Sequence, residues 1–231
     1  MIGKAAALLA LTLILAVPTA ATRADFIYAG QAYAAFAPPV VNAPVAATGP
    51  LPSTGGTLMA HADTFNFMNV VTSGALDTKT MGVNGLASSD ASVARFHADL
   101  RPLGIGFFAD ADLLTSHSEA NGNAVPASGL GSAAFTNLVV NGSPLGAAAA
   151  PNTMVSLGAL GFVVLNEQTI MDAQVSETAV HVHLNGVADI FLAHTESAIS
   201  SQAPVPEPST LLLLGVAALL ILGVHSLRLR F

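Results

Sequence analysis

The hydrophobic pattern divides the chain into two apolar ends and a middle made of short alternating segments. Residues 5–17 and 211–224 are almost continuously apolar, whereas the residues between them alternate loosely between apolar and small polar side chains. No long helical period occurs between residues 56 and 200, so the pattern predicts strands rather than helices. Strands are predicted at 57–62, 65–72, 89–100, 104–117, 132–140, 160–166 and 170–183.

Four Asn-Gly pairs punctuate this middle region: Asn84-Gly85, Asn121-Gly122, Asn141-Gly142 and Asn185-Gly186. Asn-Gly suits the positive φ angles of a tight hairpin turn. The last pair lies between two strand-like segments, 180–184 and 187–192, which together indicate a complete hairpin. A two-residue turn there pairs Leu184 with Val187 and His183 with Ala188, and it places His181 opposite Ile190.

Short strands, frequent turn signals and no helical period predict an all-β fold, an antiparallel β-sandwich-like domain over residues 57–199. A β-solenoid is the alternative, although no repeat of 20 to 50 residues recurs three times. Residues 25–56 form an Ala/Pro-rich lead-in, which several prolines make irregular, with room for one strand around Ala35 or Val40. Residues 200–208 form a linker.

Two segments within this domain are similar in sequence. Residues 111–119 align without gaps to residues 188–196, sharing Ala-Asp, two apolar residues, a small residue, His, a hydroxyl residue and Glu. This internal similarity indicates two equivalent strands of a pseudo-symmetric sheet, or a chance match in a chain of low complexity.

The N-terminal end, residues 1–24, follows the plan of a secretory signal peptide. Lys4 gives a positive start, an apolar run of 13 residues follows, and small residues come after Pro18. These features predict a signal helix that is cleaved after Ala21 or Ala24. The alternative is an uncleaved anchor, but the apolar run is shorter than the ~20 residues that span a bilayer.

The C-terminal end, residues 209–231, is predicted to be a transmembrane helix with a basic tail. The 17 residues from Leu211 to Leu227 make about 25 Å of helix, which is at the short limit for a span. Arg228 and Arg230 form a basic stop that stays cytoplasmic, so the rest of the chain lies outside.

Residues Val205, Pro206, Glu207, Pro208, Ser209 and Thr210, followed by the apolar run and the two arginines, resemble the PEP-CTERM sorting signal. The resemblance implies processing by an exosortase, a membrane cysteine protease of Gram-negative bacteria. It also implies export, a transient inner-membrane anchor through the C-terminal helix, and then release to the cell surface or the extracellular space. A permanent single-pass anchor is the alternative.

The core from Ala109 to Ile199 resembles the choice-of-anchor P family of bacterial surface proteins. The matching stretches are residues 131–142, 151–152, 160–168, 180–184 and 188–190, and the Leu-Asn-Glu-Gln block at 165–168 is the most specific of them. This resemblance implies a cell-surface module and carries no catalytic site over to the chain.

Composition narrows the classes of function. Residues 25–206 hold 13 acidic and three basic side chains, and this charge repels nucleic acid phosphates. The chain has no Cys, so disulfides and cysteine nucleophiles are excluded. No serine nucleophile elbow, phosphate-binding loop or dinucleotide fingerprint occurs. The acidic balance leaves cation binding open.

Three sets of residues could carry chemistry. His181 and His183 lie two apart, so a strand turns both to one side, where they could bind a metal together with His194; the alternative is a polar, solvent-facing pair. Glu167 could be the acid of a hydrolase. Calcium could bind the acidic side chains of Asp110, Asp112, Asp189 and Glu196.

We therefore expect an exported, non-enzymatic structural protein of the cell surface or extracellular matrix, without a cofactor. Its expected partners are the exosortase, the membrane before cleavage, and exopolysaccharide or other matrix components, but no nucleic acid. The alternative is a surface module that binds exopolysaccharide or divalent cations. The absence of Trp and the scarcity of Tyr argue against sugar binding, because sugar faces usually stack on aromatic rings.

Overall fold

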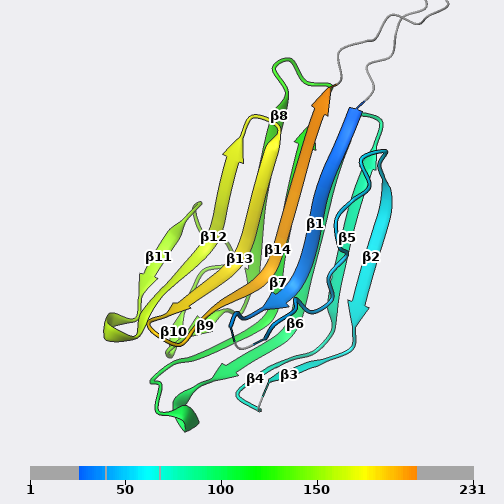
Figure 1. The fold of residues 1–231 in the computed structure, drawn as a ribbon. Coiled ribbons are helices and arrows are strands. Elements are labelled where there is room, and N and C mark those ends of the chain that lie inside the picture. The colour runs from blue at the N-terminus through cyan, green and yellow to red at the C-terminus, as the bar shows by residue number, and fades with distance from the viewer. Residues whose placement is uncertain (1–25, 40, 68, 202–231) are drawn as a thin grey trace, which may run out of the picture. The chain divides into compact units, whose positions relative to one another are not determined.

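The structure is a computed structural model that describes residues 26–39, 41–67 and 69–201 (Figure 1). These residues form strands joined by turns and two short 3-10 segments, with no α-helix among them. The strands are β1 (Phe26–Phe36), β2 (Gly56–Ala62), β3 (Phe65–Phe67), β4 (Val71–Ser73), β5 (Leu76–Val83), β6 (Leu86–Asp99), β7 (Phe108–Asn121), β8 (Ser128–Thr136), β9 (Val139–Val140), β10 (Ser143–Pro144), β11 (Thr153–Ser156), β12 (Gly161–Met171), β13 (Gln174–Leu184) and β14 (Ala188–Ser201).

The strands build two antiparallel sheets. The five-stranded sheet has the order β1-β14-β13-β12-β11. The nine-stranded sheet is centred on β6 and β7, with β5, β2 and β8 beside one end of this pair and β4, β3, β9 and β10 beside the other. Every pairing between the described strands is antiparallel, which confirms the all-β prediction and does not support a solenoid.

The two sheets face each other across a shared core. Phe107, Leu114 and Leu192 are fully buried between them. Polar contacts also cross the gap: the Ser89 hydroxyl donates to the Glu196 carbonyl oxygen at 2.7 Å. The arrangement is a sandwich of two open sheets, as the sequence pattern predicted.

The predicted signal helix and C-terminal transmembrane helix lie outside the described residues, as do the six sorting-motif residues and the basic stop. Within the described residues, no helix is long and apolar enough to cross a membrane.

The first strand corrects the predicted boundary of the domain. The lead-in was expected to be irregular, but β1 pairs with β14 along almost its whole length. Tyr28, Ala32, Ala34 and Ala35 are its buried positions. A strand around Ala35 was allowed for, but small alanines at inward sites weakened the hydrophobic pattern, so the full eleven-residue length of β1 was missed. Residues 45–53 then follow the outer edge of β1 rather than leading into the domain.

Two further predictions need correction. β5 was not predicted, although it pairs with both β2 and β6. The segment 170–183 was expected to be one strand, but it contains the turn at Asp172-Ala173 that joins β12 to β13. Asp172 takes φ 52°, which an aspartate tolerates better than most residues. This turn lacks the Asn-Gly signal on which the prediction relied.

Two of the four predicted Asn-Gly hairpin turns form as predicted, and the other two differ from the prediction. Asn84-Gly85 and Asn141-Gly142 are two-residue turns in which both residues have positive φ. Asn121-Gly122 begins the longer loop between β7 and β8. At Asn185-Gly186, pairing resumes at Leu184 and Ala188, so the predicted register is wrong by one residue.

The inward and outward alternation changes phase once within several long strands. On β14, Ile190 and Leu192 are buried at even positions, whereas Thr195 and Ser197 are buried at odd positions. Ala193 lies between them with φ 50°, while the ladder to β13 keeps its register on both sides. Similar positive φ angles occur in β6 and β12. This phase change explains why the sequence alternates only loosely.

Candidate functional site

Each histidine of the described region has a polar partner on the outer face of its sheet. Four of them lie directly opposite an aspartate of the neighbouring strand, within hydrogen-bond distance. These cross-strand pairs are His61 with Asp77, His97 with Asp110, His117 with Asp90, and His183 with Asp189. The pairing therefore follows from strand register rather than from closeness in the sequence.

His181 lies between two carboxylates on the five-stranded sheet. Its Nδ1 is 2.9 Å from Oε2 of Glu167, and its Nε2 is 3.1 Å from Oδ1 of Asp189. Carboxylates accept hydrogen bonds when they are ionised, so an oxygen at each ring nitrogen favours the doubly protonated imidazolium form of His181. Burial lowers the pKa of His181, but the hydrogen bonds to the two carboxylates outweigh it and the pKa lies above its ordinary value.

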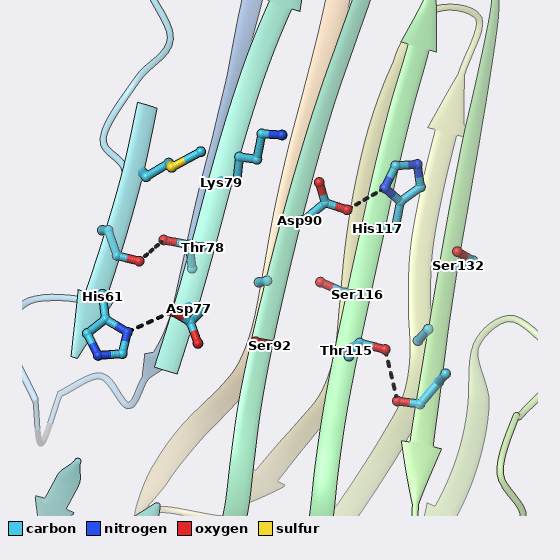
Figure 2. Close-up of a pocket in the computed structure, with 15 residues that line it drawn as sticks. His61, Asp77, Thr78, Lys79, Asp90, Ser92, Thr115, Ser116, His117 and Ser132 are labelled. Atoms are coloured by element: carbon cyan, nitrogen blue, oxygen red, sulfur yellow. Dashed lines mark hydrogen bonds and ion pairs between the residues drawn. The ribbon is translucent and has the colours of Figure 1, made fainter. Parts of the chain in front are cut away.

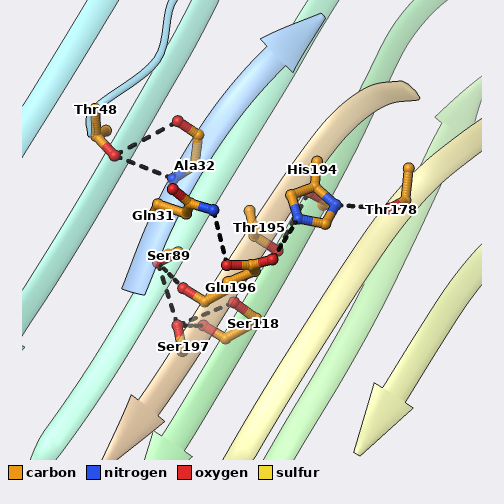
Figure 3. Close-up of polar contacts among 11 residues, drawn as sticks. Gln31, Ala32, Thr48, Ser89, Ser118, Thr178, His194, Thr195, Glu196 and Ser197 are labelled. Carbon is orange, nitrogen blue, oxygen red and sulfur yellow. Dashed lines mark hydrogen bonds and ion pairs between the residues drawn. The ribbon is translucent and has the colours of Figure 1, made fainter. Parts of the chain in front are cut away.

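His194 is held by a different set of partners (Figure 3). Its Nδ1 lies 2.8 Å from the Thr178 hydroxyl, and its Nε2 lies 3.2 Å from Oε1 of Glu196. The Gln31 amide donates to the other oxygen of Glu196 at 2.9 Å. The hydrogen bond from His194 lowers the pKa of Glu196 despite the opposing effect of burial.

Three of these imidazole rings also stack on aromatic rings. His181 stacks on Phe191 with 4.3 Å between centroids, and His183 stacks on Phe162 at 4.8 Å. His194 stacks on Tyr33 at 4.5 Å, and burial, followed by nearby carboxylates, raises the pKa of the tyrosine. We call this cluster the histidine band; it consists of His181, His183, His194, Tyr33, Phe162, Phe191, Glu167, Asp189 and Glu196.

The histidine band does not form the predicted metal site. His181 and His183 share one side of β13, as expected, and both contact Asp189. Their bonds, however, are to carboxylates, and His194 has its own partners farther along the sheet. In the part of the chain that the structure describes, no group of three or more His, Asp or Glu side chains is placed to hold a metal ion. The metal prediction has no support there.

The predicted acidic residues are spread over separate contacts. Asp110 bonds to His97, and Asp112 accepts a hydrogen bond from the Asn137 amide at 2.7 Å. Asp189 and Glu196 belong to the histidine band. The structure therefore does not gather these four acids around one point. Glu167, the candidate hydrolase acid, is tied to His181.

The outer face of the nine-stranded sheet carries a shallow hollow of about 750 Å³ (Figure 2). Strand register sets its lining in two rows across β2, β5, β6, β7 and β8. The first row is Met59, Lys79, Asp90, His117 and Ser132, and the second is His61, Asp77, Ser92, Thr115 and Ala134. The sequence did not indicate this face, because its residues come from five strands.

One carboxyl group lies inside the sandwich. Glu177 of β13 is fully buried, and neither of its oxygens has a hydrogen-bond partner among the described residues. It points toward β8, where a Cβ added to Gly131 would lie 2.9 Å from its Oε2. Burial, followed by the charge of Glu167, raises the pKa of Glu177 to about 8. No pattern in the sequence indicated that this carboxyl group would be buried.

Comparison with known proteins identifies only the tail. Residues 204–228 match the family model of the PEP-CTERM protein-sorting motif. The match contains all six predicted motif residues and Arg228, and Arg230 lies just beyond it. Searches of curated proteins and of solved structures returned no match. The resemblance of the core to the choice-of-anchor P family stays a prediction.

The chain thus carries the sorting signal of proteins that are exported, held at the membrane by a C-terminal segment and processed by an exosortase on the way to the cell surface.

Proposed function

We propose that the chain is a non-enzymatic structural protein of the cell surface or the extracellular matrix of a Gram-negative bacterium. The PEP-CTERM match supports this destination. After cleavage, the all-β domain would leave the inner membrane and act outside the cell. The signal peptide, the cleavage near residues 206–210 and the matrix role are parts of this proposal.

The observation that carries the non-enzymatic proposal is the pairing of histidines with carboxylates. General acid–base catalysis needs a titratable group that can reach a substrate proton. Here the imidazoles of the described strands bond to acids or hydroxyls of their own sheet, and Glu167 bonds to His181. In this proposal these contacts join neighbouring strands of the module instead of reaching a substrate.

The sorting proposal is tested by the mass and location of the native protein in cells with and without the exosortase. With the enzyme, we expect a chain that begins near Thr22 or Asp25, ends near Pro208 and lies outside the cell. Without it, we expect the C-terminal tail to remain and the protein to stay in the inner membrane.

A tail variant and a matched control sharpen this experiment. Pro206→Ala combined with Pro208→Ala should leave the tail uncut, because both prolines belong to the matched sorting motif. Pro52→Ala removes an exposed proline outside the tail and should be processed normally. An intact C-terminus in the inner membrane of both strains would mean a permanent anchor and would contradict the proposal.

The hollow favours a second candidate function, a binding module for exopolysaccharide. Its hydroxyl groups and its two His–Asp pairs offer donors and acceptors to a polyhydroxylated chain lying across the strands. Phe, Tyr and Trp are absent from its lining, so sugar rings could not stack on these side chains there. Retention of the protein on isolated exopolysaccharide would favour this candidate over a purely structural role.

A further inference from the structure

Among the described residues, the edge strand β1 of the five-stranded sheet is covered, whereas the edge strand β8 of the nine-stranded sheet is not. The outer edge of β1 is covered by residues 45–53: the Thr48 amide donates to Ala32, Leu51 to Gly30, and Tyr28 to Ser53. The edge of the nine-stranded sheet at β8 has no comparable cover. β8 pairs only with β7, and its sequence, Ser-Gly-Leu-Gly-Ser-Ala-Ala-Phe-Thr, contains no charged residue and no proline. Such an uncharged edge is a template for pairing with another strand.

The direction of the free backbone groups on β8 follows from one hydrogen bond. The Phe135 amide donates to the Ala147 carbonyl at 2.9 Å, so it points away from β7. In an antiparallel ladder, residues two apart point the same way, and β8 keeps its register with β7. The amide and carbonyl groups of Gly129, Gly131 and Ala133 therefore face outward, and these groups have no partner among the described residues.

We infer that β8 pairs antiparallel with β8 of a second copy of this chain, around a two-fold axis at Gly131. The free groups are symmetric about that residue, so Gly131 meets its own counterpart and Gly129 meets Ala133 of the other copy. Each of these three pairs exchanges two bonds, giving about six main-chain hydrogen bonds. A self-complementary patch of this kind closes into a dimer.

The side chains of β8 fit this pairing. On the outer face, Leu130, which is 57% exposed, lies opposite Ser132 of the second copy, at a non-hydrogen-bonded site where side chains approach closely. On the inner side, Gly129 and Gly131 place no side chain in the way. Residues 26–201 hold 12 acidic and three basic side chains, so the two copies repel each other and added salt should strengthen the dimer.

The test compares the mass in solution of the exported protein and of three variants, recovered from the cells that produce it and analysed by sedimentation velocity. The wild type should be a dimer. Leu130→Lys with Ser132→Lys places lysines opposite each other and should weaken dimerisation about tenfold or more. Leu130→Lys with Ser132→Glu alters the same two sites but creates opposite-charge pairs, so the dimer should persist.

Met59→Lys is the control for added charge, since Met59 is 70% exposed on β2 at the opposite edge of the sheet. It should leave the dimer intact. A monomeric wild type at every soluble concentration would overturn the inference. So would a dimer that Met59→Lys disrupts and Leu130→Lys with Ser132→Lys does not, because β2 would then be the contact. A cooperative thermal unfolding transition in every variant shows that none has lost its fold. The dimer does not depend on where the protein is sorted, so this result is separate from that of the exosortase experiment.

Discussion

Carboxyl groups on the outer faces of the sandwich and the one between its sheets are in opposite situations. Outside, Asp77, Asp90 and Asp189 each lie opposite a histidine of the next strand and remain partly exposed. Inside, Glu177 is fully buried and has no polar partner among the described residues. The same chemical group is thus stabilised in one region and destabilised in the other.

This difference shows how burial sets the size of an electrostatic effect. Exposed ion pairs contribute little because water and salt screen them. A buried acid without a partner is costly when it ionises, so it keeps its proton and its pKa rises. The interior also contains a network of hydroxyl groups in which Ser197 contacts Ser89 and Ser118 (Figure 3). These buried hydroxyls have hydrogen-bond partners, whereas the carboxyl group of Glu177 has none among the described residues.

The largest effect should come from Glu177→Gln. The folded pKa of Glu177, about 8, lies above its ordinary value of 4.5. Between these two values the unfolded chain ionises while the folded chain keeps the proton, so the free energy of unfolding falls by about 1.4 kcal/mol per pH unit as pH rises. At pH 8 the free energy of unfolding of the variant should exceed that of the wild type by a few kcal/mol. Urea unfolding of both proteins at several pH values measures this difference.

The control is Glu119→Gln, which makes the same change on an outer face, where the side chain is 35% exposed. Its unfolding free energy should follow the pH profile of the wild type within a few tenths of a kcal/mol. Parallel profiles for Glu177→Gln and the wild type would show that the buried carboxyl finds a partner and would remove the contrast between the faces.

An intermediate effect is expected for Ser197→Ala. The Ser197 hydroxyl lies 2.9 Å from that of Ser118 and 3.2 Å from that of Ser89, and all three are buried. Its loss should reduce the free energy of unfolding by about 1 kcal/mol. Ser200→Ala, on the exposed end of the same strand, is the matched control and should have no measurable effect. Equal effects would mean that the network adds nothing to stability.

The smallest effect on stability should come from Asp90→Asn. The hydrogen bond to Asp90 raises the pKa of His117 above its ordinary value, so the pair stabilises the fold at low pH and this contribution is lost as pH rises through the folded pKa. Because both groups are partly exposed, the loss should stay below about 1 kcal/mol. NMR titration should show the pKa of His117 falling toward its ordinary value, while that of His61, which bonds to Asp77, stays the same. An unchanged His117 would contradict the pairing.

The sequence predicted the features that depend on neighbours along the chain. Asn84-Gly85 and Asn141-Gly142 form tight turns because both residues of each pair tolerate positive φ. The sequence could not predict the partners of the histidines. His117 and Asp90, for example, are 27 residues apart in the chain, and only the register between their strands brings them together. The one-residue error at Asn185-Gly186 shows how readily such a register shifts.

By itself, the sequence determined the all-β antiparallel class and the sorting tail, since turn chemistry, strand-like runs and the order of the tail segments are all local properties. Only the tertiary structure decided that Phe26–Phe36 is a full strand, that His181 and His194 share one outer face, and that Glu177 is buried. The physical reason is that strand pairing and burial join residues that lie far apart in the chain. The phase change near Ala193, for example, turns the even position His194 to the same outer face as the odd position His181.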